Sequence, residues 1–314
     1  MATRIAAHRG LARVFALSLC LLVQGLPAGA AERLRAVATF SILGDLVRQV
    51  GGDAVAVTDL VAPDADAHGY SPAPGDSRML AAADVVVVNG LGFEGWLDRL
   101  IRASGSKAPV VVASAGVATI AARHDHDHGA GGGGGEAQTA DPHAWQNVAN
   151  AKVYVANIRD GLSRADPGHA ADYARNAGAY LAKLDALDAD IRTTLARIAP
   201  EHRRVITTHD AFGYFSASYG LAFLAPQGVS TESEASPRDV ARIIRQIRRD
   251  KVPAVFIETI ADPRLMQQVA RESGARIGGK VYSDALSGPA GPAPTYLDMM
   301  RSNLRAFDAA LGPG

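Results

Sequence analysis

Short runs of β-branched and other apolar residues recur along most of the chain, and longer stretches with helical spacing lie between most of them. Short apolar runs are typical of buried strands, whereas apolar positions three and four residues apart are typical of helices. We expect strands at 35–40, 55–61, 85–89, 109–113, 205–208, 222–225, 254–258 and 280–283. Because strands that alternate with helices form parallel sheets covered on both faces, the pattern predicts an α/β fold with two such sets.

Helices are expected at 42–50 and 237–249, and the start of the second is predicted in detail. Ser236 can cap the helix, Pro237 suits its first turn, and Asp239 completes a capping box with Ser236. In such sheets, binding groups belong at the carboxyl ends of the strands.

One long helical stretch, from about 167 to 198, separates the two sets of strands. Thirty residues of helix would span about 45 Å, which is enough to run past two lobes and join them. We therefore expect an N-terminal α/β lobe at 31–165, a linker helix at 166–199 and a C-terminal α/β lobe at 200–314. The alternative is an ordinary long surface helix within one domain. The apolar face of this helix consists of Tyr173, Tyr180, Leu184, Leu187, Ile191, Leu195 and Ile198.

The first thirty residues have the features of a cleaved secretory signal. A segment with three arginines and no acidic residue precedes a mostly apolar run at 14–23, and small residues follow at 28–30. We expect cleavage near Ala30 or Ala31 and a periplasmic protein. Cys20, the only cysteine, lies inside the apolar run after Leu19, which argues against a lipid attachment site. The mature chain would then have neither a disulfide nor a thiolate ligand.

Composition narrows the function further. The 314 residues include 32 basic and 32 acidic side chains, so no excess of charge points to nucleic acid or to an anionic membrane. No stretch after the signal is apolar enough to cross a bilayer. We expect a monomer with no nucleic-acid partner.

A histidine- and glycine-rich segment at 124–136 is expected to form a mobile loop of the first lobe, because glycines favour flexibility. Its histidines alternate with aspartates at the start of the segment. They could capture a metal ion weakly, or the segment could be a solvated insertion that the fold tolerates. The histidines are His124, His126 and His128.

Four further residues lie near expected strand ends or in loops: His68, His143, His209 and Asp284. Two of them precede the long helix and two follow it, so a fold of two lobes could bring all four to one cleft. Taken singly, a histidine or aspartate at a strand end more often has a structural role. Glu258 also ends an expected strand, and it could orient an imidazole or serve only as a capping or surface residue.

Five short motifs lie in or near these positions: Asp66-Ala67-His68-Gly69-Tyr70-Ser71-Pro72, Asn89-Gly90-Leu91-Gly92-Phe93-Glu94 with Trp96, Asp141-Pro142-His143 with Trp145, Thr208-His209-Asp210-Ala211-Phe212, and Asp284 ahead of Leu286. With these motifs the sequence resembles the zinc and manganese receptors of ABC importers, the cluster A-I solute-binding proteins. The resemblance covers nearly the whole mature chain, and AztC-like or ZnuA-like zinc receptors are the nearest branch. One departure is Ala67, where the family usually has proline.

This resemblance implies two α/β lobes joined by a rigid long helix, with a metal ion in the cleft between them. It also implies that His68, His143, His209 and Asp284 bind the ion, and that the protein is a receptor rather than an enzyme. The implied partners are a membrane permease with its cytoplasmic ATPase, and a periplasmic metallochaperone is a further candidate.

The expected ligand set favours Zn²⁺, because three imidazoles and one carboxylate suit tetrahedral zinc. In manganese receptors of the family the third ligand is typically glutamate, whereas this chain has His209. A manganese or iron receptor is the first alternative, and an exported zinc hydrolase is the second. Imidazoles with an ordinary pKa near 6.5 would lose zinc below about pH 6.

Overall fold

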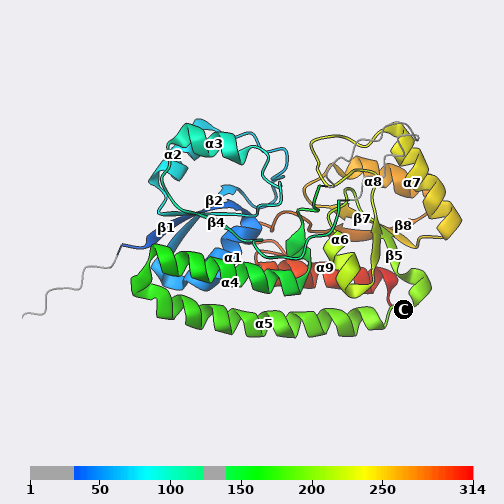
Figure 1. Ribbon diagram of the computed structural model, residues 1–314. Helices are drawn as coiled ribbons and strands as arrows, with labels where there is room; N and C mark the ends of the chain where they lie inside the picture. The colour runs from blue at the N-terminus through cyan, green and yellow to red at the C-terminus, as the bar shows by residue number, and fades with distance from the viewer. Residues whose placement is uncertain (1–31, 123–138, 314) are drawn as a thin grey trace, which may run out of the picture. The chain divides into compact units, whose positions relative to one another are not determined.

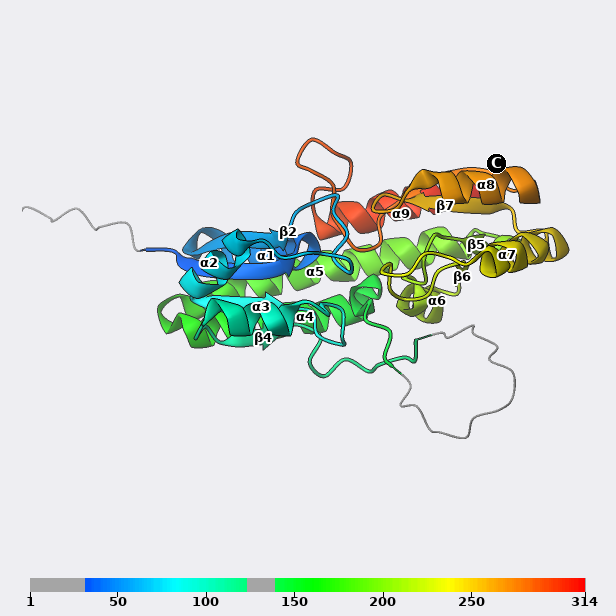
Figure 2. The ribbon, with the colours of Figure 1, turned by 90° about the horizontal axis from the view of Figure 1, so that it is seen from above.

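The computed structural model describes residues 32–122 and 139–313 (Figures 1 and 2). The expected signal at 1–30 and the segment 124–136, with His124, His126 and His128, therefore lie outside the described residues. Among the described helices, none is long and apolar enough to cross a membrane.

Two sheets of four parallel strands form the framework, with the strand orders β2-β1-β3-β4 and β6-β5-β7-β8. This confirms the α/β prediction. The strands are β1 (Leu34–Phe40), β2 (Val55–Val61), β3 (Val85–Val88), β4 (Val110–Val112), β5 (Arg204–Ile206), β6 (Ala222–Leu224), β7 (Ala254–Glu258) and β8 (Arg276–Val281).

Helices flank both sheets (Figure 1). Those of the first half are α1 (Ser41–Gly51), α2 (Pro74–Ala82), α3 (Leu97–Ser104) and α4 (Val148–Ala165), and those of the second are α6 (Gly213–Tyr219), α7 (Pro237–Asp250), α8 (Pro263–Ser273) and α9 (Tyr296–Leu311). Helix α7 starts as predicted, because the Ser236 side chain accepts a hydrogen bond from the backbone N–H of Asp239.

The long helix is α5 (Ala170–Ala196), which a short 3-10 turn at Pro167–His169 precedes. It packs against α1 and α4 beside the first sheet and against α6 and α9 beside the second. All seven apolar residues of the predicted face are buried. The helical periodicity therefore identified the surface that α5 packs against helices of both halves, although Ile198 lies just past the end of α5.

Strand β8 differs most from its predicted position, since it begins at Arg276 rather than at residue 280 and ends at Val281. Gly278 and Gly279 weaken the strand signal of its first part, and Gly279 has a φ of +133°. The register with β7 also shifts near these glycines. Asp284 consequently lies in the loop after β8 rather than directly at the end of the strand.

Candidate metal centre

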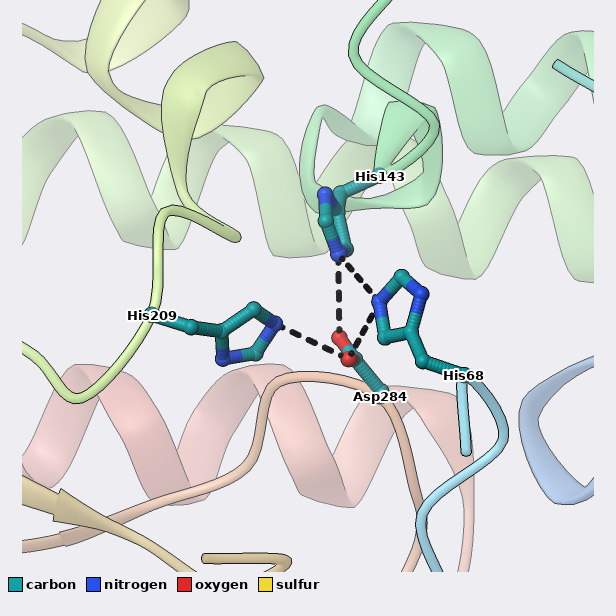
Figure 3. Close-up of side chains that lie close together, drawn as sticks. All are labelled: His68, His143, His209 and Asp284. Carbon is teal, nitrogen blue, oxygen red and sulfur yellow. Dashed lines mark hydrogen bonds and ion pairs between the residues drawn. The ribbon is translucent and has the colours of Figure 1, made fainter. Parts of the chain in front are cut away.

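The structure brings the four predicted site residues together. One nitrogen or oxygen from each of His68, His143, His209 and Asp284 lies within 4.8 Å of those of the others (Figure 3). His68 comes from the loop after β2, and His209 follows β5. Because the carboxyl ends of parallel strands are where such folds place binding groups, this clustering agrees with the sequence pattern.

The Asp284 carboxylate lies at the centre of the cluster (Figure 3). Its Oδ2 atom is 3.0 Å from His209 Nε2 and 3.3 Å from His68 Nε2. Its Oδ1 atom is 3.6 Å from His143 Nε2. The Nε2 atoms of His68 and His143 are 3.2 Å apart. Three imidazole nitrogens of the same type thus face one carboxylate, an arrangement that matches a donor set for a cation.

These side chains are almost completely buried. Exposure is 4% for the side chain of His68 and 0% for those of His143, His209 and Asp284. Within the described part of the chain, neither oxygen of Asp284 accepts a hydrogen bond. Buried polar atoms are normally satisfied, because leaving them unpaired costs free energy. A bound cation would satisfy the Asp284 oxygens and the facing imidazole nitrogens together.

Burial and nearby charges shift the pKa values of the three imidazoles in different directions. Burial opposes a charge on His143, but the carboxylates of Asp284 and Asp141 outweigh it and raise the pKa of His143 to about 9. Burial likewise opposes a charge on His209, where Glu258 and Asp284 prevail and hold the pKa well above its usual value. For His68, burial prevails and lowers the pKa. Two of the three rings therefore carry a proton at neutral pH when no metal is bound.

The carboxylate of Asp284 has the complementary shift. Burial alone would raise its pKa, but the facing rings of His209 and His143 hold the pKa well below the ordinary value of 3.8. Asp284 is thus ionised throughout the neutral range. A cation entering the site would meet a permanent negative charge at its centre.

Two carboxylates contact the Nδ1 atoms of His209 and His143, on the side of each ring that faces away from Asp284. Glu258, at the end of β7, places Oε2 2.6 Å from His209 Nδ1, so of its two expected roles it has the orienting one. Asp141 Oδ1 lies 2.8 Å from His143 Nδ1 and also accepts from the His143 backbone N–H. The sequence motif Asp141-Pro142-His143 did not by itself assign this role to Asp141, although the spacing of two residues allows the double contact. In both rings Nδ1 is thus engaged, and Nε2, which faces Asp284, would be the metal donor once its proton has left.

Replacing Glu258 with glutamine is expected to weaken metal affinity by about 10- to 100-fold, the usual effect of losing such a partner. The Glu258 Oε1 atom accepts from the backbone N–H groups of Thr208 and His209. A glutamine that keeps those bonds would turn its NH₂ group towards His209 Nδ1. The ring would then carry its proton on Nε2, where it blocks a metal bond. Calorimetric titration measures the change.

The matched control is Asp59→Asn, which alters a largely buried carboxylate that pairs with Arg48 away from the site. Metal affinity should not change in this variant. Equal affinity in Glu258→Gln and the unmodified protein would contradict the orienting role of Glu258.

A cavity of about 240 Å³ adjoins the cluster on the side of His68. Its lining comes from both sheets' loops, and includes Phe93 and Pro142 from the first half and Val229 and Ser230 from the second. The ring of Phe93 packs edge-on against His68 at 4.5 Å between centroids. His68, the one ring of the cluster with some exposure, is also the member of the cluster that lines this cavity.

Known proteins with similar sequences and folds identify the family of this chain. Residues 36–310 match the family model of ZnuA, the periplasmic component A of the zinc-uptake complex. The iron-binding protein YfeA of Yersinia pestis is 34% identical over 296 residues, which cover 94% of this chain and 92% of YfeA. The manganese-binding lipoprotein MntA of Halalkalibacterium halodurans is 35% identical over 280 residues, which cover 89% of each protein.

Among solved structures, the periplasmic zinc-binding protein TroA from Treponema pallidum matches with a TM-score of 0.81 at 29% identity, covering 90% of this chain and 100% of TroA. These relatives are named for iron, manganese and zinc. The similarity therefore shows a metal-binding transport protein but does not identify its metal. The chain belongs to the ZnuA family and is a metal-binding solute-binding protein of an ABC transporter.

Proposed function

We propose that this protein captures Zn²⁺ with His68, His143, His209 and Asp284 and delivers it to an ABC importer. The observation that carries the proposal is the convergence of three imidazole Nε2 atoms on one buried carboxylate. Zn²⁺ favours four-coordinate sites of this composition. The metal is the cargo of the protein, and no reaction at the site is proposed.

The preference for zinc rests on the type of ligands. Imidazole nitrogen suits zinc, whereas carboxylate, carbonyl and water oxygens suit manganese. His209 supplies a third imidazole where the family's manganese receptors typically have glutamate. A manganese or iron receptor is the second candidate, and the names of YfeA and MntA favour it.

A hydrolytic zinc site is the least supported alternative. Such a site keeps one coordination position open for water beside three protein ligands. Here the Asp284 carboxylate faces all three imidazoles and would take the fourth position. A closed set of four protein donors favours binding and release over water activation.

Competitive titration of the metal-free protein tests the choice of metal. We expect one tightly bound Zn²⁺ per chain, and weaker binding of Mn²⁺ and Fe²⁺ in the same chelator competition. Replacing His209 with glutamate should shift the preference towards Mn²⁺, because one nitrogen donor becomes an oxygen donor. Tighter binding of manganese than of zinc by the unmodified protein would overturn the zinc assignment.

The same proposal includes the export and assembly of the receptor. Residues 1–30 would direct export and be removed near Ala30 or Ala31, leaving a periplasmic monomer. The lobes would comprise residues 31–165 and 200–314, with 166–199 as the linker. The membrane permease and its ATPase would accept the metal, and a periplasmic metallochaperone would be a source of it. His124, His126 and His128 would add a weak auxiliary capture site.

A further inference from the structure

Asp284 follows β8 of the second sheet, but its loop is bonded to elements of the first half of the chain. The carbonyl oxygen of Ser283, which precedes Asp284, accepts two hydrogen bonds. One comes from Trp145 Nε1 at 3.0 Å and the other from Gln146 Nε2 at 2.8 Å. All three groups are buried. The Asp284 backbone is therefore held partly by residues that lie about 140 positions earlier in the chain, in addition to Asn303 of α9, which bonds both backbone groups of Tyr282.

The same loop has three further bonds to the first half. The backbone N–H of Leu286 donates to Ser41 Oγ at 3.0 Å, and its carbonyl accepts from the N–H of Asp64 at 2.8 Å. The N–H of Gly288 donates to the Asp64 carboxylate at 2.9 Å. Ser41 begins α1, and Asp64 lies in the loop that leads from β2 to His68. The loop that carries Asp284 is thus bonded to the start of α1 and to the loop that leads to His68.

The 3-10 turn Ala144–Gln146 connects two ligands directly. It follows His143 without a break, and two of its side chains hold the carbonyl before Asp284. His143 and Asp284 are consequently fixed by one rigid turn. Together with His68, they make three donors that are held by the first half, although Asp284 belongs to the second half by sequence.

His209 is held differently. Its backbone N–H and its Nδ1 atom both face Glu258, which ends β7 of the second sheet. Helix α6, which follows His209, does touch the first half, because the Tyr214 hydroxyl donates to the carbonyl of Asp141 at 3.0 Å. That contact holds the start of α6, whereas the imidazole itself is oriented from β7. Three ligands are therefore held by the first half of the chain and one by the second, although two come from each half by sequence.

We propose that His68, His143 and Asp284 form a pre-assembled three-donor subsite that captures the metal first, and that His209 joins afterwards and retains it. Gln146 is a positioning residue of this subsite, since it holds the segment that carries Asp284. The cavity that His68 lines fits this order, because an ion entering there would meet His68, a member of the subsite, and His209 does not line it. This inference rests on the proposed four-residue metal site.

The rates of metal association and dissociation test the order of binding. Stopped-flow mixing of the metal-free protein with Zn²⁺ gives association, and mixing of the loaded protein with excess chelator gives dissociation. In His209→Gln we expect the association rate to stay unchanged, because the three capturing donors remain. Dissociation should be faster by more than about tenfold, because the donor that retains the metal is lost. In His143→Gln, association itself should slow. Equal slowing of association in both variants would overturn the three-to-one division.

The role of Gln146 is tested by Gln146→Leu, alone and combined with His209→Gln. Leucine has a similar size, and it also removes the buried Oε1 atom, which has no hydrogen-bond partner in the described structure. The fold should therefore persist, which circular dichroism checks. We expect zinc affinity to fall by about tenfold in both backgrounds, because Gln146 acts on the subsite and not on His209.

The outcomes separate this inference from the proposed function. If Gln146→Leu lowers only the unfolding temperature and leaves zinc affinity unchanged in both backgrounds, Gln146 is not a positioning residue and the inference fails. If the unmodified protein itself binds no Zn²⁺ tightly, the proposed function fails instead.

Discussion

Replacing His143 with alanine is expected to remove tight zinc binding. The affinity should fall by more than about 100-fold, because losing only a group that orients a metal ligand already costs up to about that factor. The ring is fully buried and its Nε2 atom faces both His68 and Asp284. Alanine removes a direct metal bond, and it also leaves the buried Asp141 carboxylate without its ring partner. Isothermal titration with Zn²⁺, together with metal analysis of the purified protein, measures the effect.

Two controls separate the cluster from the other histidines of the chain. His169→Ala removes a partly exposed ring in the 3-10 turn before α5, where it pairs with Asp166 away from the cluster, so zinc affinity should stay unchanged. Deletion of residues 124–136 should also leave the tight site intact, and should at most slow loading or remove a weaker second zinc. Loss of the tight site in the deletion variant, with normal binding in His143→Ala, would place the metal in the histidine-rich segment instead.

Zinc binding at pH 7 is expected to release about two protons per metal ion, and affinity should keep rising with pH up to about 9. The pKa of His143 is raised to about 9 and that of His209 lies well above its usual value, so both rings are protonated before the metal binds. The metal must displace these protons, and it does so more easily as the pH rises. His68, with a lowered pKa, is already neutral and releases none.

Calorimetry in buffers with different ionisation enthalpies gives the number of protons released. His209→Gln should release about one proton fewer, which assigns the difference to that ring. The sequence alone led us to expect the loss of affinity mainly below about pH 6. The carboxylates around His143 and His209 move this range upward. An affinity that stays constant between pH 6.5 and pH 9 would contradict the raised pKa values.

Local patterns in the sequence determined the secondary structure of this protein. The bounds of β2 and β7 follow from short apolar runs, and the buried face of α5 follows from apolar positions at helical spacing. The start of α7 follows from Ser236 and Pro237, because helix capping depends on neighbouring residues only. The four clustered residues were also found in advance, through short motifs that resemble a known family.

The tertiary structure alone decided how these residues work together. Glu258 and His209 are 49 residues apart, and they meet because β5 pairs with β7 in the second sheet. The attachment of Asp284 to the turn after His143 likewise depends on a loop that crosses back to the first half of the chain. Neither strand order nor such a crossing leaves a periodic signal in the sequence. The pKa values of the ligands follow from these long-range contacts and from burial, so they too became visible only in the folded protein.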